Sequence, residues 1–95
     1  MFSFLYAYTI KGWVMHMKLK DAFVKRLKNI LKEKGLTQYA LFKISGVPQS
    51  TISSILNSNT KSISFKTIYD ICSGLGMEFS EFFDDKILKL ENIDE

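Results

Sequence analysis

The 95-residue chain has 46% hydrophobic side chains, a single proline and a formal net charge of +3, which together predict one folded domain with a modest core. Its single cysteine excludes an internal disulfide and a cysteine-based zinc site, so we expect a reducing cytoplasmic location and neither a metal nor another cofactor. The chain has no apolar run of about 18 residues, which argues against a membrane span.

The first residues of the chain form an aromatic extension. Aromatic or β-branched side chains stand at every second position of residues 2–10, which is the period of a strand, although a helical spacing fits the same stretch. Gly12 would break this strand and allow a hairpin that pairs with a second copy or with the rest of the chain. In the alternative interpretation, Met15 or Met17 is the true start and the residues before it are an upstream extension.

Residues 18–34 predict an amphipathic helix. Lys25, Lys28 and Lys32 fall outside its apolar stripe, and Gly35 is a natural stop because glycine enters positive φ without steric penalty. The apolar stripe consists of Phe23, Leu27, Ile30 and Leu31.

Residues 36–57 predict two short helices joined by a tight turn. Thr37 suits the N-cap of the first helix, because its hydroxyl can accept a hydrogen bond from an amide of the first turn. Residues 38–44 then follow as the first helix, with Leu41 on the inner face. Gly46 stands where the chain must turn sharply.

The second helix of this pair is expected to begin at Pro48 and to end at Asn57. Proline fits the first turn of a helix, where its missing N–H has no partner to lose. Ile52 and Ile55 are three positions apart and face inward together. The outward positions carry short polar side chains that can reach base edges and phosphates: Gln49, Ser50, Thr51, Ser53, Ser54 and Asn57.

Two further helices are expected after a polar loop at residues 57–63. Ser64 is the expected cap of the fourth helix and Gly76 its end, while Ser80 is the expected cap of the fifth. The residues expected to face inward are Phe65, Ile68, Ile71, Cys72, Leu75, Phe82 and Phe83.

The chain closes with an acidic tail at residues 86–95, which is expected either to extend the fifth helix or to fray. Residues 1–77 carry eleven Lys or Arg against three acidic residues, whereas residues 78–95 carry two against seven. A basic body suits a polyanionic partner, and the acidic tail is expected to stay away from the face that binds it.

The paired helices resemble the helix-turn-helix of phage repressors and Cro-like (XRE-type) regulators over about residues 19–83. The resemblance implies an all-α, compact five-helix domain at residues 18–85. The N-terminal β-like extension at residues 1–17 and the tail at residues 86–95 lie outside it. The residues at the signature spacings of the family are Gln38, Gly46, Val47, Ile52 and Ile55.

Two residues of the pair depart from the family pattern. Phe42 replaces the usual alanine, which implies either a slightly opened pair of helices or a ring turned outward into the neighbouring core. Ser45 is more polar than the usual leucine before the turn glycine.

The resemblance assigns the second helix to base recognition. It implies that Gln49, Ser50 and Ser54 read bases, and a glutamine can bond N6 and N7 of adenine together. Thr51 and Ser53 flank these positions and are expected to contact the DNA backbone or bound water.

A second set of residues is expected to hold the phosphates of double-stranded DNA. The family uses the positions of Gln38 and Asn57 for this purpose, and a helix N-terminus at Gln38 already presents amides to an anion. Lys43, Lys61 and Lys66 are further candidates because they surround the motif with positive charge.

These observations predict a sequence-specific DNA-binding transcriptional regulator, a repressor that binds a pseudo-palindromic operator as a homodimer. Two alternatives stay open. The chain could be the antitoxin of a toxin–antitoxin pair, with the aromatic amino end binding the toxin. It could also be a protein-interaction module of the same fold, which the lack of Lys or Arg in the second helix favours.

One histidine and one cysteine supply no nucleophile–base pair, so no enzymatic activity is expected.

Overall fold

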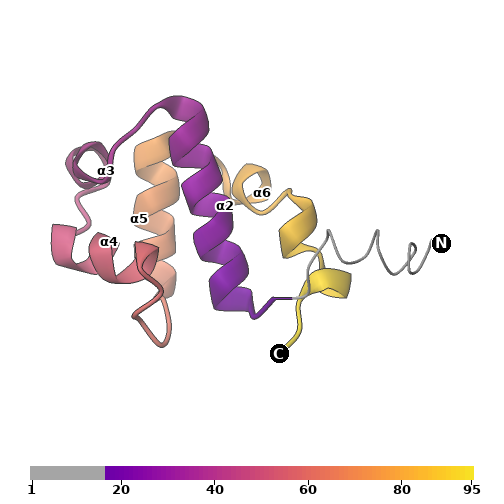
Figure 1. Ribbon diagram of the computed structural model, residues 1–95. Coiled ribbons are helices and arrows are strands. Elements are labelled where there is room, and N and C mark those ends of the chain that lie inside the picture. Colours follow the sequence, from indigo (N-terminus) through magenta and orange to yellow (C-terminus); the bar gives the residue numbers. More distant parts are fainter. Residues whose placement is uncertain (1–16) are drawn as a thin grey trace.

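The computed structural model describes residues 17–95, and the strand or hairpin expected before them lies outside the described residues. Within the described part, the only β-pairing is an isolated bridge between Met17 and Ile93. The expected all-α, five-helix repressor-like architecture is confirmed (Figure 1). The elements are α2 (Leu19–Lys34), α3 (Gln38–Ser45), α4 (Gln49–Leu56), α5 (Phe65–Leu75) and α6 (Phe79–Phe82), followed by the 3-10 turns η1 (Lys86–Leu88) and η2 (Leu90–Asn92).

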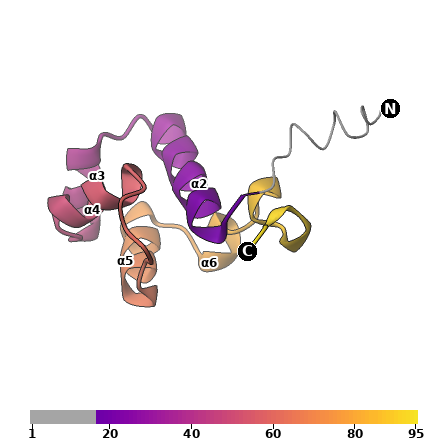
Figure 2. The same cartoon turned by 60° about the horizontal axis from the view of Figure 1, so that its bottom comes forward.

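Helix α2 lies between the α3–α4 pair and the C-terminal turns, as Figures 1 and 2 both show. Its expected apolar stripe is buried, with Leu27 fully enclosed. The helix ends where expected, because Gly35 adopts φ 66° and its N–H donates to the Lys32 carbonyl at 3.2 Å. The Leu36 N–H donates to the Leu31 carbonyl at 2.8 Å, which completes the C-terminal cap.

All five helices contribute side chains to one core. Phe82 of α6 is completely buried, and its ring centroid lies 5.0 Å from that of Phe23 on α2. Burying side chains of this size contributes about 1.5–3 kcal/mol each, so the short α6 is held by packing and not by its own propensity. The core consists of Phe23, Val24, Leu27, Ile30, Leu31, Leu41, Val47, Ile52, Ile55, Ile71, Cys72, Leu75 and Phe82.

Two expectations for the last helices are wrong. Phe65 does not face inward but is 74% exposed, because it stands in the first turn of α5 and its ring lies against Phe79, 5.5 Å away between centroids. Ser80 is not the cap of the fifth helix, since α6 already begins at Phe79. Glu78 is the N-cap, and the Glu81 carboxylate accepts its N–H at 2.9 Å.

The acidic tail neither extends α6 nor frays, but folds back on α2 as η1 and η2. Arg26 of α2 holds its beginning. The guanidinium donates from Nε to the Phe82 carbonyl at 2.7 Å and from Nη2 to the Glu81 carbonyl at 2.9 Å. It also pairs with the Asp85 carboxylate at 3.4 Å. The bond from Nε gives the Phe82 carbonyl, at the end of the short helix, a partner.

The last residues of the tail bind the start of α2. The Met17 N–H donates to the Asn92 carbonyl at 3.1 Å, and the Asp94 N–H donates to the Met17 carbonyl at 2.8 Å. The Glu95 carboxylate accepts the Leu19 N–H at the first turn of α2, where negative charge is favourable. Both views place the tail on the side of α2 that faces away from α3 and α4 (Figures 1 and 2).

Candidate nucleic-acid interface

The first helix of the pair, α3, begins as the sequence predicts. The Thr37 hydroxyl accepts the Ala40 N–H at 3.0 Å, which satisfies one amide of the first turn. Leu41 is completely buried, while Gln38 and Tyr39 are exposed at the start of the helix. The side chain of Gln38 therefore stands beside the N-terminal end of α3, in contact with solvent.

The turn after α3 is held by backbone geometry and by one hydroxyl. Gly46 adopts φ 75°, as expected, and its N–H donates to the Phe42 carbonyl at 2.9 Å. The Ser45 hydroxyl donates to the Leu41 carbonyl at 2.6 Å and accepts the Val47 N–H at 3.1 Å. The polar residue before the turn glycine thus ties the end of α3 to the turn.

Phe42, which replaces the usual alanine, lies at the edge of the core. Its side chain is half-buried, and its ring centroid is 5.8 Å from that of Tyr39 on the same helix. The close contact in this region is made elsewhere. Gly74 of α5 lies against the backbone of α3, and a Cβ atom there would be 2.7 Å from the Ile44 carbonyl oxygen.

The second helix, α4, begins one residue later than the sequence suggested. Pro48 is not in the first turn but is the N-cap, with φ −54° and ψ 145°, so Gln49 is the first helical residue. Proline supplies no side-chain acceptor here, which leaves amides of the first turn available to an outside anion. Ile52 and Ile55 are buried, as expected, and fix the orientation of α4 on the core.

The outward face of α4 is polar and carries no charged side chain. Gln49 and Ser50 are exposed at its beginning, and Thr51, Ser53 and Ser54 are half-buried. A groove of about 270 Å³ runs between α4 and the loop that leads to α5. Its hydroxyl side chains are Ser50, Thr51, Ser54, Thr60, Ser62, Ser64 and Thr67.

Four hydroxyl side chains of this groove were not predicted as site residues: Thr60, Ser62, Ser64 and Thr67. The run at residues 57–63 was expected to be a loop, and the structure confirms that it is not helical. Its serine and threonine residues were interpreted as turn formers. Their high number in so short a segment also indicates a polar surface. The groove brings Thr60 and Ser62 beside the two α4 residues Ser50 and Ser54.

Asn57 caps the end of α4 and holds a neighbouring hydroxyl. Its amide nitrogen donates to the Ser53 hydroxyl at 3.3 Å, and its side chain is exposed. Ser58 follows with φ 57°, the one positive φ of a non-glycine residue in the described part of the chain. A left-handed conformation is unfavourable for a residue with a Cβ atom.

The strain at Ser58 gives a testable expectation for stability. Ser58→Gly should raise the free energy of unfolding by about 0.5–1 kcal/mol, because glycine adopts this φ without steric penalty. Thermal or urea denaturation measures the change. Ser62→Gly is the matched control in the same loop and should lower stability slightly. A Ser58→Gly protein no more stable than the parent would contradict the left-handed conformation.

The candidate lysines differ in their surroundings. The Lys43 ammonium lies 6.0 Å from the centre of the Tyr39 ring, on the exposed surface of α3. Lys61 is exposed on the loop after α4. Lys66 instead forms an ion pair with Asp70 at 2.7 Å, so its charge is partly compensated within α5. Lys43 and Lys61 are thus the better placed of the three to meet phosphate.

A family model described as helix-turn-helix matches residues 27–82, from the middle of α2 to the end of α6. The chain belongs to the helix-turn-helix family. It is of the XRE type, the group that includes phage repressors and Cro-like proteins. This helix-turn-helix protein is therefore a DNA-binding transcription regulator. No curated protein and no solved structure matches the chain. Between residues 17 and 95, no helix combines the length and the apolar character that a membrane span requires.

Proposed function

We propose that this regulator is a repressor that binds a pseudo-palindromic operator as a homodimer in the cytoplasm, with α4 as the helix that reads base sequence. The outward face of α4 supports this proposal most directly. Gln49 and Ser50 project from its first turn, while Ile52 and Ile55 hold the opposite side in the core. The apolar inner face fixes α4 on the core and leaves its polar face free to contact a partner.

The dimensions of α4 suit the major groove. The groove of B-DNA is about 12 Å wide and admits a helix about 10–12 Å in diameter, and the eight residues of α4 place about 12 Å of helix in it. Glutamine can accept and donate at once, so Gln49 matches the N6–N7 edge of adenine. Ser50 and Ser54 lie on the same side and add hydroxyls that bond more than one kind of base.

The surroundings of α4 can hold the sugar–phosphate backbone. Gln38 stands at the N-terminal end of α3, where helix amides and the helix dipole favour an anion. Thr51, Ser53 and Asn57 flank the base-reading positions with hydroxyl and amide groups. These contacts would fix the register of α4 but would carry little sequence information. Lys43 and Lys61 would add long-range attraction from the two sides of the motif.

A homodimer follows from the small reading surface. One short helix contacts only a few base pairs, which gives too little specificity for a single target in a genome. Two copies related by a two-fold axis read two half-sites about one helical turn apart, so the operator is expected to be a pseudo-palindrome.

One observation favours a second candidate function. The α4 helix has no Lys or Arg, although arginine and lysine are the commonest readers of guanine. The same fold could therefore serve as a protein-interaction module that does not bind DNA. Binding to random duplex DNA at two salt concentrations separates these functions, because a DNA-binding protein loses affinity steeply as salt rises.

Gln49→Ala should weaken binding to the operator by about 1–3 kcal/mol and leave binding to random duplexes nearly unchanged. The operator is first obtained by selecting genomic fragments that the protein retains. Fluorescence anisotropy then gives both affinities. Gln38→Ala is the matched control, because it removes the same side chain from α3 and should weaken both duplexes by a similar factor. Equal losses for Gln49→Ala on both duplexes would exclude base reading by this residue.

Lys43→Ala and Lys61→Ala should weaken binding to every duplex, and each should lower the slope of log K against log salt by about one unit. The slope counts the phosphates that the protein neutralises. Lys89→Ala is the control, because this exposed lysine lies in the tail on the far side of α2. It should leave the slope unchanged. A parental slope in both test variants would remove these lysines from the phosphate contacts.

A further inference from the structure

Helix α5 has an exposed ridge that DNA reading by α4 leaves unused. Phe65 and Tyr69 stand four residues apart and are 74% and 57% exposed, which is unusual for two aromatic side chains on one helix. Ser73 continues the same i, i+4 row and Gly76 follows it, and both are exposed. The ridge therefore passes from two large residues in its first half to two small ones in its second half.

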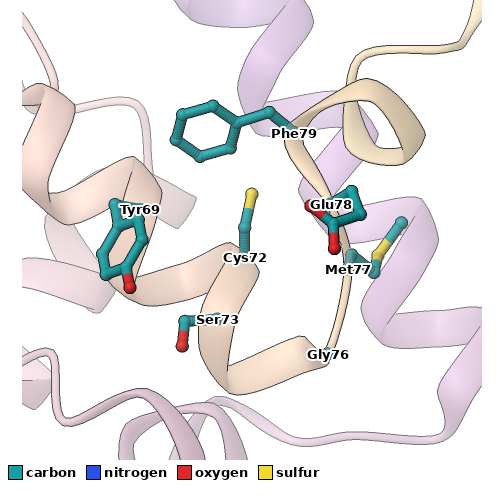
Figure 3. A pocket seen from close by; sticks show the side chains of 7 residues that line it. All are labelled: Tyr69, Cys72, Ser73, Gly76, Met77, Glu78 and Phe79. Atoms are coloured by element: carbon teal, nitrogen blue, oxygen red, sulfur yellow. The ribbon is translucent and has the colours of Figure 1, made fainter.

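A hollow of about 470 Å³ lies at the small end of this ridge, between the end of α5 and the start of α6 (Figure 3). The rings of Tyr69 and Phe79 pack edge to face at its rim, 6.4 Å apart between centroids, and Cys72 lines it with its sulfur directed toward Phe79. Ser73 and Gly76 leave its outer side open because they carry little or no side chain. The hollow is large enough for one aromatic ring with its neighbouring atoms.

We propose that two copies of this chain pair through α5, with the helices antiparallel across a two-fold axis near Tyr69. In this arrangement Phe65 of each copy enters the hollow beside Ser73 and Gly76 of the other. A two-fold interface must be self-complementary, and a row with large residues at one end and small residues at the other meets this requirement only when antiparallel. The inference rests on the proposed homodimer and assigns it a surface.

The charges on this surface are also self-complementary. Lys66 and Asp70 flank the ridge in its first half, and Glu78 lines the hollow beyond its second half. Antiparallel pairing brings Lys66 of one copy toward the C-terminal end of α5 in the other, near Glu78 at the N-cap of α6. It also sets the positive N-terminal end of each helix beside the negative C-terminal end of its partner.

The size of the ridge sets the expected strength of the dimer. Eleven residues of helix give a contact about 16 Å long and about 10–12 Å wide, so the ridge buries less than the roughly 1,200 Å² of standard specific interfaces. We therefore expect the free protein to dissociate at micromolar concentrations and the dimer to be stronger on a two-half-site operator, where both copies bind the same duplex.

The first test is the mass of the full-length chain in solution, measured by sedimentation equilibrium over a range of concentrations. Phe65→Asp should raise the dissociation constant of the dimer about tenfold or more, because it removes the ring and places a negative charge beside Glu78 of the other copy. Leu90→Asp is the matched control, since Leu90 is 93% exposed in the tail and lies outside the ridge. It should leave the dissociation constant unchanged. A parent chain that is monomeric throughout, or equal effects of the two variants, would overturn the proposal.

The second test fixes the orientation of the two helices. Tyr69→Cys places a thiol near the proposed axis, so a short bis-maleimide should join two copies of this variant. Tyr39→Cys is the matched control, because Tyr39 is 55% exposed but lies on α3. The natural Cys72 is buried, and burial raises the pKa of its thiol, which makes it a poor competitor for the reagent. Equal cross-linking of the two variants would contradict pairing through α5.

A third variant separates this surface from the aromatic extension. A chain that starts at Met17 should keep its dimer if α5 forms the interface. Loss of the dimer in that chain, with Phe65→Asp still dimeric, would assign the interface to the extension and overturn the proposal. The proposed repressor function is tested separately from the dimer. It fails if the full-length parent shows no salt-dependent binding to DNA. Phe65→Asp should still bind a single half-site with parental affinity.

Discussion

Gly74→Ala is expected to lower the free energy of unfolding by about 2–3 kcal/mol, which is the effect of forcing an extra group into a packed contact. The added Cβ would lie 2.7 Å from the Ile44 carbonyl oxygen and 2.8 Å from the Ser45 Cα atom. Both are backbone atoms of α3, so no side-chain rotation can relieve the overlap. Helix α5 would have to move away from α3 and from the turn that positions α4.

The sign of this effect is what makes the test informative. In an ordinary helix interior, glycine to alanine stabilises a protein by about 1 kcal/mol. Ser73→Ala, at the exposed neighbouring position, is the control and should be neutral or slightly stabilising. Urea denaturation gives both values. A Gly74→Ala protein as stable as the parent would mean that α3 and α5 are farther apart than the structure places them.

Local rules explain which features of the fold could be predicted. Thr37 and Gly46 act on neighbours within four residues, through a cap and a positive φ, so the sequence around them was sufficient. Ile52 and Ile55 were assigned correctly because a short helix with one apolar face has only one way to bury it. The positions of the two helices in the chain followed from these signals.

Contacts between distant segments could not be predicted in the same way. No local pattern calls for glycine at position 74, inside a helix. A side chain is excluded there only because the backbone of α3 lies against it. Arg26 was counted as part of a basic surface, yet its guanidinium binds carbonyls 55 and 56 residues later in the chain. The fold of the tail depends on this pairing, so no local pattern in the tail could predict it.

The candidate site shows the same division. Gln49 and Ser50 were assigned from the spacing of the motif, and the structure leaves both exposed at the start of α4. The period of α5 placed Phe65 on the inward face, but burial depends on what lies opposite each turn. The hollow beside the exposed ridge is formed by α5 and the start of α6 together, so no pattern within either helix could predict it.

The turn glycine gives the second large effect. Gly46→Val should lower the free energy of unfolding by about 2–3 kcal/mol, because a β-branched residue is strained at a φ of 75°. Nothing lies within 4 Å of the Cβ position at Gly46, so the penalty comes from backbone conformation and not from a clash. Side chains that tolerate the left-handed region should therefore lose less.

This origin predicts an order among substitutions at one position. Gly46→Asn should lose about 0.5–1 kcal/mol and Gly46→Ala about 1–2 kcal/mol, with Gly46→Val the worst of the three. Size alone would give a different order, since asparagine is larger than alanine. Thermal melts of the three proteins measure the series, and operator binding below the melting temperature should fall in the same order because the turn orients α4. If alanine were tolerated better than asparagine, the left-handed conformation of this turn would be wrong.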